Sequence, residues 1–386
     1  MPRIPFRLIL AHARKNKLRA LLTVGSVFMA VMIFGFLRTF IVGMETSLNE
    51  CNAARVVTGS RLSLFAHVPI KLQPELKALA EDKALGITHF TWFGGIYLNS
   101  DPEHYWGRFG VDVESFRVVY GGDLNMPEGQ WTKWSATRQG CIIGADLAKD
   151  EQLTIGSRVR VSGNIFPGEL DLEVLGIYTS KVRSFDQKTM FFHWDYMNEL
   201  SRKEGGRADV VSTFTMLLKS PQDAAPLCSK VDAEFESSPH RTLTMTERMF
   251  QAQFNAMWGN LPLFFGILGG VVLFACLMVT SNTMMLNARE RVQETGVLKT
   301  LGFTAPMLLC MTMVESLLLC LLGGGLAMLL VQSVDGKMLM FVIASVPPST
   351  VWTGLGIAAL LGVLSGLFPA LMVSRLQIVE ALRRRA

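Results

Sequence analysis

Four apolar segments, each long enough to cross a lipid bilayer, constrain this chain more than any other feature of its sequence. A membrane-spanning helix needs about 20 predominantly apolar residues. The second and fourth segments contain no charged residue, while Arg38 lies near the end of the first and Glu315 lies inside the third. The sequence therefore predicts a multi-pass α-helical membrane protein with four transmembrane helices. Their expected bounds are residues 20–43, 261–286, 307–331 and 351–373.

A cleaved signal peptide is the alternative interpretation of the first apolar segment. Its apolar run is longer than the core of about 7–15 residues found in signal peptides, and no clear A-x-A cleavage site follows it. We therefore expect this segment to remain in the membrane.

The composition agrees with a membrane protein, because only 18% of the residues are charged, below the roughly 25% that is usual for soluble domains.

Lys and Arg in the short loops predict the orientation of the helices, because such loops are rich in basic residues on the cytoplasmic side. Basic residues gather in three regions, whereas the loop 332–350 carries a single lysine. With four spans, the three basic regions fall on one side of the membrane. We therefore expect both termini to be cytoplasmic, with residues 44–260 outside. The basic regions are residues 1–19, 287–306 and 374–386.

The segment 44–260 is predicted to fold as a large α+β extracytoplasmic domain between helices 1 and 2, because more than 200 residues can build a core of their own. Residues 247–259 are expected to form a polar helix that runs directly into the second transmembrane helix. The apolar residues 338–346, which Pro347 and Pro348 end, are interpreted as an interfacial or re-entrant piece of the outer loop. Alternating apolar positions predict strands, and helical periodicity predicts helices: strands at 141–144, 159–161, 172–177 and 213–218, helices at 74–82 and 222–235.

Aromatic residues are dense in the first half of this outer segment. They are interpreted first as core, with a surface for an acyl chain or a partner protein as the alternative. The residues are Trp92, Tyr97, Tyr105, Trp106, Trp131 and Trp134.

The sequence offers no catalytic or metal-binding constellation. Its six cysteines form no C-x-x-C pair, its six histidines are scattered, and neither G-x-S-x-G nor H-E-x-x-H occurs. One disulfide among Cys51, Cys141 and Cys228 stays open at this point. We assign no catalytic residue and no metal ligand, and we expect neither an enzyme nor a nucleic-acid partner.

A charged stretch, residues 288–303, lies between the second and third apolar segments. Glu290 and Glu294 are four residues apart, as are Val297 and Leu301, so charge and apolarity fall on different faces of a helix. Held between two membrane spans, such a helix is interpreted as a cytoplasmic handle that moves the membrane helices; solvated loop charges are the alternative. Two glycines allow close approach of a partner and a helix end. The candidate contact residues are Arg289, Glu290, Arg291, Glu294, Gly296, Leu298, Lys299, Leu301 and Gly302.

The third apolar segment carries one carboxylate and three consecutive glycines. An ionisable side chain in a bilayer suggests function, but Glu315 has no intramembrane Lys, Arg or His as a partner. We therefore favour a protonated or hydrogen-bonded Glu315 that packs one helix on another. Gly323, Gly324 and Gly325 are expected to allow close helix packing, with a flexible hinge as the alternative.

Five phrases in fixed order resemble the MacB/FtsX-like ABC transporter permeases, the family that includes the LolC and LolE subunits. The resemblance covers nearly the whole chain and implies an FtsX-like permease domain at 261–380 and a MacB-like periplasmic core domain at 44–260. The phrases occupy residues 14–23, then 142–148 with 155–159, then 288–303, then 315–316 with 323–325, and finally 366–370 with 380–383.

In that family the loop after the second span is a coupling helix that docks on a cytoplasmic ATPase, and motion rather than substrate crosses the membrane. The resemblance therefore implies mechanotransmission for export or extraction of a hydrophobic or amphiphilic cargo such as a lipoprotein, a lipid or a drug. An FtsX-like signalling permease that activates a cell-wall hydrolase is the alternative, and a membrane receptor without an ATPase is a more distant one.

The resemblance also implies partners. The chain contains no G-x-x-x-x-G-K-[ST] phosphate-binding loop, so ATP and Mg would be bound by a separate ABC ATPase subunit, with no cofactor bound by this chain itself. A second permease copy or paralogue would complete a dimer. Membrane lipids surround the helices, and a periplasmic adaptor or carrier protein is a further candidate partner.

Overall fold

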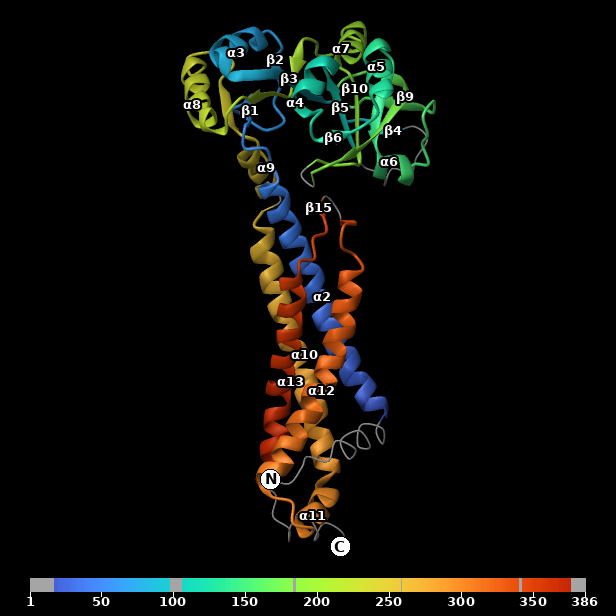
Figure 1. The fold of residues 1–386 in the computed structure, drawn as a ribbon, viewed down its shortest axis with the longest axis vertical. Helices are drawn as coiled ribbons and strands as arrows, with labels where there is room; N and C mark the ends of the chain where they lie inside the picture. Colours follow the sequence, from blue (N-terminus) through green and yellow to red (C-terminus); the bar gives the residue numbers. More distant parts are fainter. Residues whose placement is uncertain (1–16, 98–105, 183–184, 258, 340–341, 376–386) are drawn as a thin grey trace. The chain divides into compact units, whose positions relative to one another are not determined.

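The computed structural model describes residues 17–97, 106–182, 185–257, 259–339 and 342–375. Most of the predicted cytoplasmic termini, residues 1–16 and 376–386, lie outside the described residues. The chain divides into two compact units, here called the membrane unit and the outer unit (Figure 1). The membrane unit comprises Met1–Glu45 with Gly259–Ala386, and the outer unit comprises Thr46–Trp258.

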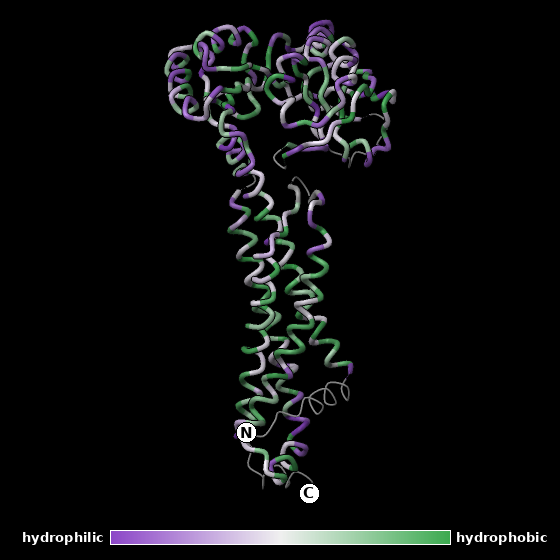
Figure 2. The backbone as a smooth tube through the Cα atoms, in the orientation of Figure 1, coloured by the Kyte–Doolittle hydropathy of each residue, from purple (hydrophilic) through white to green (hydrophobic). Residues whose placement is uncertain are grey.

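The described residues of the membrane unit include four long helices, each long and apolar enough to cross a membrane. Figure 2 shows that their hydrophobic residues extend along most of their length. This confirms the predicted number and kind of spans, although each helix extends past its predicted bounds because polar residues at the ends continue the helical turns. The helices are α2 (Lys17–Asn49), α10 (Leu261–Glu290), α12 (Ala305–Gln332) and α13 (Pro348–Arg375).

Two shorter pieces connect these helices. A separate helix, α11 (Val292–Thr300), lies between α10 and α12. In the loop before α13, β14 (Met338–Leu339) pairs with β15 (Val342–Ile343) in antiparallel fashion. Residues 340–341 of the predicted interfacial piece lie outside the described residues.

The outer unit is an α+β domain, as predicted. Its described residues form an eleven-stranded sheet in the order β13-β1-β12-β3-β5-β10-β7-β9-β8-β4, with β6 paired to β9. Parallel pairing joins β5 to β10 and β7 to β9, while the other neighbours are antiparallel. The strands are β1 (Arg55–Ser60), β3 (Ala84–Trp92), β4 (Ile96–Tyr97), β5 (Gly107–Val111), β6 (Leu124–Asn125), β7 (Gly140–Gly144), β8 (Arg158–Ser162), β9 (Glu169–Ser180), β10 (Thr189–His193), β12 (Thr213–Leu218) and β13 (Thr242–Thr246).

Helices and one small sheet complete the outer unit. The predicted strands correspond to β7, β8, β9 and β12, and the predicted helices correspond to α3 and α8. The small sheet pairs β2 (Val68–Pro69) with β11 (Val210–Val211). The helices are α3 (Leu72–Ala80), α4 (Val113–Tyr120), α5 (Glu128–Ala136), α6 (Ala145–Asp150), α7 (Trp194–Lys203), α8 (Ala224–Glu234) and α9 (Glu247–Ala256), with 3₁₀ turns at Glu81–Lys83 and Pro221–Asp223.

Aromatic side chains fill the core of the outer unit. Trp131 and Trp134 are buried beside Phe116, and the Trp134 Nε1 donates a hydrogen bond to the Gly140 carbonyl at 3.2 Å. Tyr97 and Trp106 are buried as well, while Tyr105 lies outside the described residues. Burial of these rings removes large apolar areas from water, which is the main favourable contribution to folding. All six cysteines are free, so none of the three in the outer unit forms a disulfide.

The expected continuous helix from residue 247 into the second span is wrong. Helix α9 ends at Ala256, and α10 begins at Leu261 after a break. Gly259 has φ +83°, a left-handed conformation that glycine adopts without strain. The Asn260 side chain then accepts a hydrogen bond from the Leu263 amide at 3.1 Å and caps the new helix. Because Pro262 lies in the first turn of α10, it starts this helix and cannot continue an earlier one.

His89 gives the outer unit a pH-dependent stability. Burial lowers the pKa of His89 to about 4, so the folded state keeps this side chain neutral where the unfolded chain, with a pKa near 6.5, binds a proton. Stability should therefore fall by roughly 3 kcal/mol as pH drops from about 6.5 to about 4. Thermal unfolding of the full chain at a series of pH values measures this slope. The His89→Phe variant should show a flatter slope, and an unchanged slope would refute the assignment.

Candidate functional site

The charged stretch forms a corner of two helices and not one continuous helix. Arg289 and Glu290 belong to the last turn of α10, and Arg291 separates this helix from α11. After α11, Gly302 adopts φ +93°, and its amide donates to the Lys299 carbonyl at 3.1 Å. The amide of Phe303 donates to the Leu298 carbonyl at 3.1 Å. These bonds satisfy the last carbonyls of α11 and turn the chain into α12.

One face of α11 packs against the rest of the membrane unit. Gly296 and the neighbouring Thr295 are buried, as is Val292 at the start of the helix. The half-buried Leu298 packs on a small apolar cluster. Two of the candidate contact residues, Gly296 and Leu298, therefore hold α11 in place and do not face outward. The cluster consists of Ala288, Leu308 and Val373 with Phe303 and Met372 at its edge.

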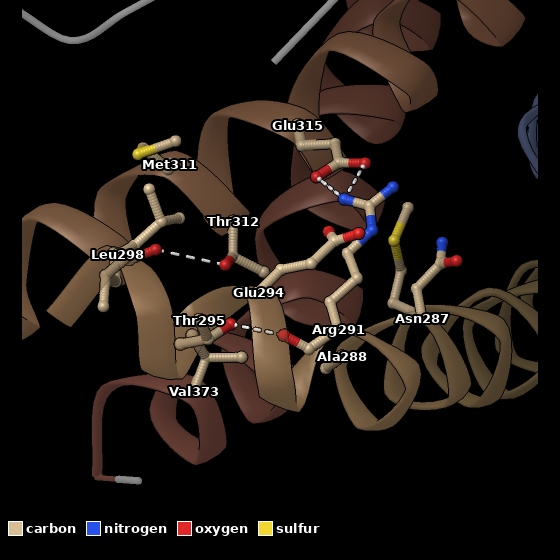
Figure 3. Close-up of a pocket in the computed structure, with 12 residues that line it drawn as sticks. Asn287, Ala288, Arg291, Glu294, Thr295, Leu298, Met311, Thr312, Glu315 and Val373 are labelled. Carbon is tan, nitrogen blue, oxygen red and sulfur yellow. Dashed lines mark hydrogen bonds and ion pairs between the residues drawn. The ribbon is translucent and has the colours of Figure 1, made fainter. Parts of the chain in front are cut away.

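Glu315 is hydrogen-bonded to a cation that lies outside the predicted membrane spans. The Arg291 Nη1 donates to both carboxylate oxygens of Glu315, at 3.0 and 2.9 Å (Figure 3). The two side chains are only 15% and 13% exposed. Arg291 reaches α12 because it stands at the corner where the chain turns back from α10. This cation comes from the charged stretch and not from a predicted membrane span.

Lys299 provides a second polar link. Its Nζ donates to the Ser374 carbonyl near the end of α13 at 2.9 Å. Thr295 donates its hydroxyl to the Arg291 carbonyl at 2.8 Å and so fixes the corner itself. Charged groups thus connect the α10–α11 corner to both α12 and α13.

A cavity of about 60 Å³ lies between α11 and the helices around it. Polar groups from the corner face it, including Asn287, Arg291 and Glu294, and Glu315 and Thr312 line it from α12 (Figure 3). Such a volume admits one or two water molecules between polar partners. The remaining lining residues are Met284, Ala288, Thr295, Leu298, Leu308, Met311 and Val373.

The opposite face of the corner is exposed. Arg289, Glu290, Leu301 and Gly302 lie on it. Val297 belongs to this face too, with 49% of its surface exposed, beside Leu301 with 71%. Val297 is not among the candidate contact residues predicted from the sequence. Its spacing of four residues from Leu301 nevertheless places the two side chains on the same face of a helix. The described residues contain no group of three or more His, Cys, Asp or Glu side chains that could hold a metal ion.

The three glycines of α12 have different surroundings. A Cβ atom on Gly323 would lie 2.7 Å from the Val24 carbonyl oxygen, and one on Gly324 would lie 2.4 Å from the Ala358 Cβ. Gly325 has no neighbour within 4 Å of such an atom. The first two therefore lie where α12 meets α2 and α13, respectively.

Comparison with known proteins shows which family the chain resembles. Residues 266–378 match the family model of the FtsX-like permease C-terminal domain, a span that includes the corner and Glu315. An uncharacterized ABC transporter permease of Methanocaldococcus jannaschii is 22% identical over 392 residues, which cover 96% of each chain. The chain is therefore similar to MacB/FtsX-like ABC transporter permeases, as the sequence resemblance predicted.

Two MacB proteins are also similar to parts of this chain. The macrolide export ATP-binding/permease protein MacB of Bartonella henselae is 34% identical over 109 residues, which are 27% of this chain and 16% of that protein. The crystal structure of the periplasmic region of MacB from Actinobacillus actinomycetemcomitans aligns with 54% of this chain and 95% of that one, with 12% identity and a TM-score of 0.38.

Proposed function

We propose that this permease subunit transmits the motion of a separate cytoplasmic ATPase across the membrane to its outer unit. The observation that carries the proposal is the division of the α10–α11 corner into two faces. Val297 and Leu301 are exposed on one face, while Arg291 and Lys299 are bound to α12 and α13 on the other. In this proposal α11 and both termini are cytoplasmic, and residues 44–260 lie outside the bacterial inner membrane.

The physical basis is that α11 is too short to be stable alone. An isolated helix of fewer than about 12 residues is marginal in water, so this one depends on its packed face. A displacement of the exposed face is therefore passed to the helices that hold α11. The Arg291–Glu315 pair suits this role, because a mostly buried ion pair is screened less by salt than a surface pair.

The partners follow from the same proposal. The ATPase subunit would bind ATP and Mg, and a second permease copy or paralogue would supply the other docking face for a dimeric ATPase. The cargo would be hydrophobic or amphiphilic, such as a lipoprotein, a lipid or a drug. The MacB relatives are named for macrolide export, which supports including drugs. A periplasmic adaptor or carrier protein would act with the outer unit.

Docking can be tested by capture of a candidate ABC ATPase subunit on this chain in mild detergent. The double variant Val297→Asp with Leu301→Asp should retain at least about tenfold less ATPase than the wild type, because central apolar contacts contribute about 2 kcal/mol or more each to binding. A matched control makes the same changes at Val118 and Ile155, which are exposed apolar residues of the outer unit. Wild-type capture by the double variant would contradict the docking face.

A further inference from the structure

A buried charge network lies where the chain enters and leaves the outer unit. Arg55, the first residue of β1, is 3% exposed. Its Nη1 donates to both Glu247 carboxylate oxygens at 3.0 and 3.2 Å, and its Nη2 donates to the Asp123 carboxylate. The guanidinium stands 4.2 Å from the centroid of the Tyr120 ring. We call Arg55, Tyr120, Asp123 and Glu247, with the backbone amide of Asn52, the Arg55 node.

The Glu247 carboxylate accepts further hydrogen bonds within the node. Glu247 accepts from the Asn52 amide at 2.9 Å and from the Tyr120 hydroxyl at 3.4 Å. Burial raises the pKa of Tyr120 well above its usual value, and the Glu247 carboxylate adds to this effect. The phenol therefore stays a neutral donor.

Burial alone would lower the pKa of Arg55, but Glu247 and the other partners outweigh it and keep the pKa above its usual value. The guanidinium thus stays charged between two carboxylates.

The node joins segments that are far apart in the sequence. Arg55 and Asn52 follow α2, and Glu247 is the first residue of α9, which precedes α10. Asp123 lies in the turn between α4 and β6, and its carbonyl accepts from the Lys181 amide at 2.8 Å, next to the end of the long strand β9. One guanidinium therefore links the two ends of the outer unit to each other and to a turn that leads into β9.

We propose that the Arg55 node is a clamp that makes the two ends of the outer unit and the α4–β6 turn move as one body. Hydrogen bonds from the two terminal nitrogens of Arg55 to two different carboxylates fix the orientation of the guanidinium, and their low exposure protects them from water and salt. Without the clamp, a displacement of one end would separate these three segments locally. It would then not move the other end or the α4–β6 turn. The role of the clamp during ATP turnover rests on the proposed function. The mechanical link between these segments does not depend on that function.

The test is amide hydrogen exchange of the full chain in lipid nanodiscs, without an ATPase. The variant Arg55→Met with Asp123→Asn and Glu247→Gln removes the charged links and leaves no uncompensated buried charge. Exchange should rise by about tenfold or more in residues 50–57, 118–126 and 244–250, the change expected when hydrogen bonds to charged groups are lost from a local opening. The matched control, Arg158→Met with Asp171→Asn, alters an exposed ion pair and should change no rate in these segments.

Strands β7 and β10, in the interior of the sheet, serve as internal references. Their exchange should stay at the wild-type rate if the node acts on the junction. Wild-type exchange in the three junction segments would overturn the clamp. An equal rise in the junction and in β7 and β10 would overturn it too, because the node would then contribute only to global stability.

Discussion

Replacing Glu315 with leucine while Arg291 remains is expected to destabilise the membrane unit by about 3 kcal/mol. Removing one partner of a buried ion pair leaves the other charge without compensation, and the two side chains are only 15% and 13% exposed. Unfolding of the purified chain in mixed micelles with increasing SDS measures the loss. The neighbouring Arg289→Leu variant is the control, because Arg289 is exposed and its removal should change stability by less than about 0.5 kcal/mol.

A double variant distinguishes the effect of an unpaired buried charge from the effect of altered side-chain packing. Replacing both partners, Arg291→Met with Glu315→Leu, should recover most of the lost stability, since apolar residues can substitute for a buried ion pair at little cost. Equal stability of the Glu315→Leu and Arg289→Leu variants would contradict the pairing.

Replacing Gly324 with alanine is expected to destabilise the chain by about 2 kcal/mol, because the added methyl would lie 2.4 Å from the Ala358 Cβ, which cannot rotate away. Gly323→Ala should behave similarly, since its methyl would meet the Val24 carbonyl oxygen at 2.7 Å. Gly325→Ala is the matched control, with nothing within 4 Å. It should be neutral or gain up to about 1 kcal/mol from the better helix propensity of alanine. The same SDS unfolding measures all three variants.

This series also separates the two interpretations of the glycine run. Close packing predicts that Gly323 and Gly324 are sensitive and Gly325 is not. A flexible hinge predicts that each alanine stiffens the helix in the same way and that none lowers stability. Equal responses at the three positions would therefore contradict the packing of α12 against α2 and α13.

Local patterns predicted most of the fold. Long apolar runs gave the four spans because a bilayer requires a minimum length, and the alternation of Thr213–Leu218 gave β12 with its observed bounds. The two-residue strands β4 and β6 carry no such periodicity, since pairing with β8 and β9 creates them. Gly259, Asn260 and Pro262 indicate a break before α10 in the sequence itself. The prediction of a continuous helix did not take these residues into account.

The site was predictable only where it depends on helical spacing. The four-residue interval between Val297 and Leu301 indicated their common exposed face. The pairing of Arg291 with Glu315 depends on the corner between α10 and α11, which no periodicity shows. The bond between Arg55 and Glu247 joins residues that are 192 positions apart. Contacts of this kind follow from tertiary packing and therefore need the structure.

In the proposed function, adjacent residues of α11 serve opposite faces, one for the ATPase and one for the membrane helices. Placing a photo-reactive amino acid at Val297 or at Leu298, in membranes that also contain the ATPase, tests this claim most directly. We expect cross-links to the ATPase from position 297, and cross-links within this chain from position 298. Equal cross-linking of the ATPase from both positions, or none from either, would contradict it.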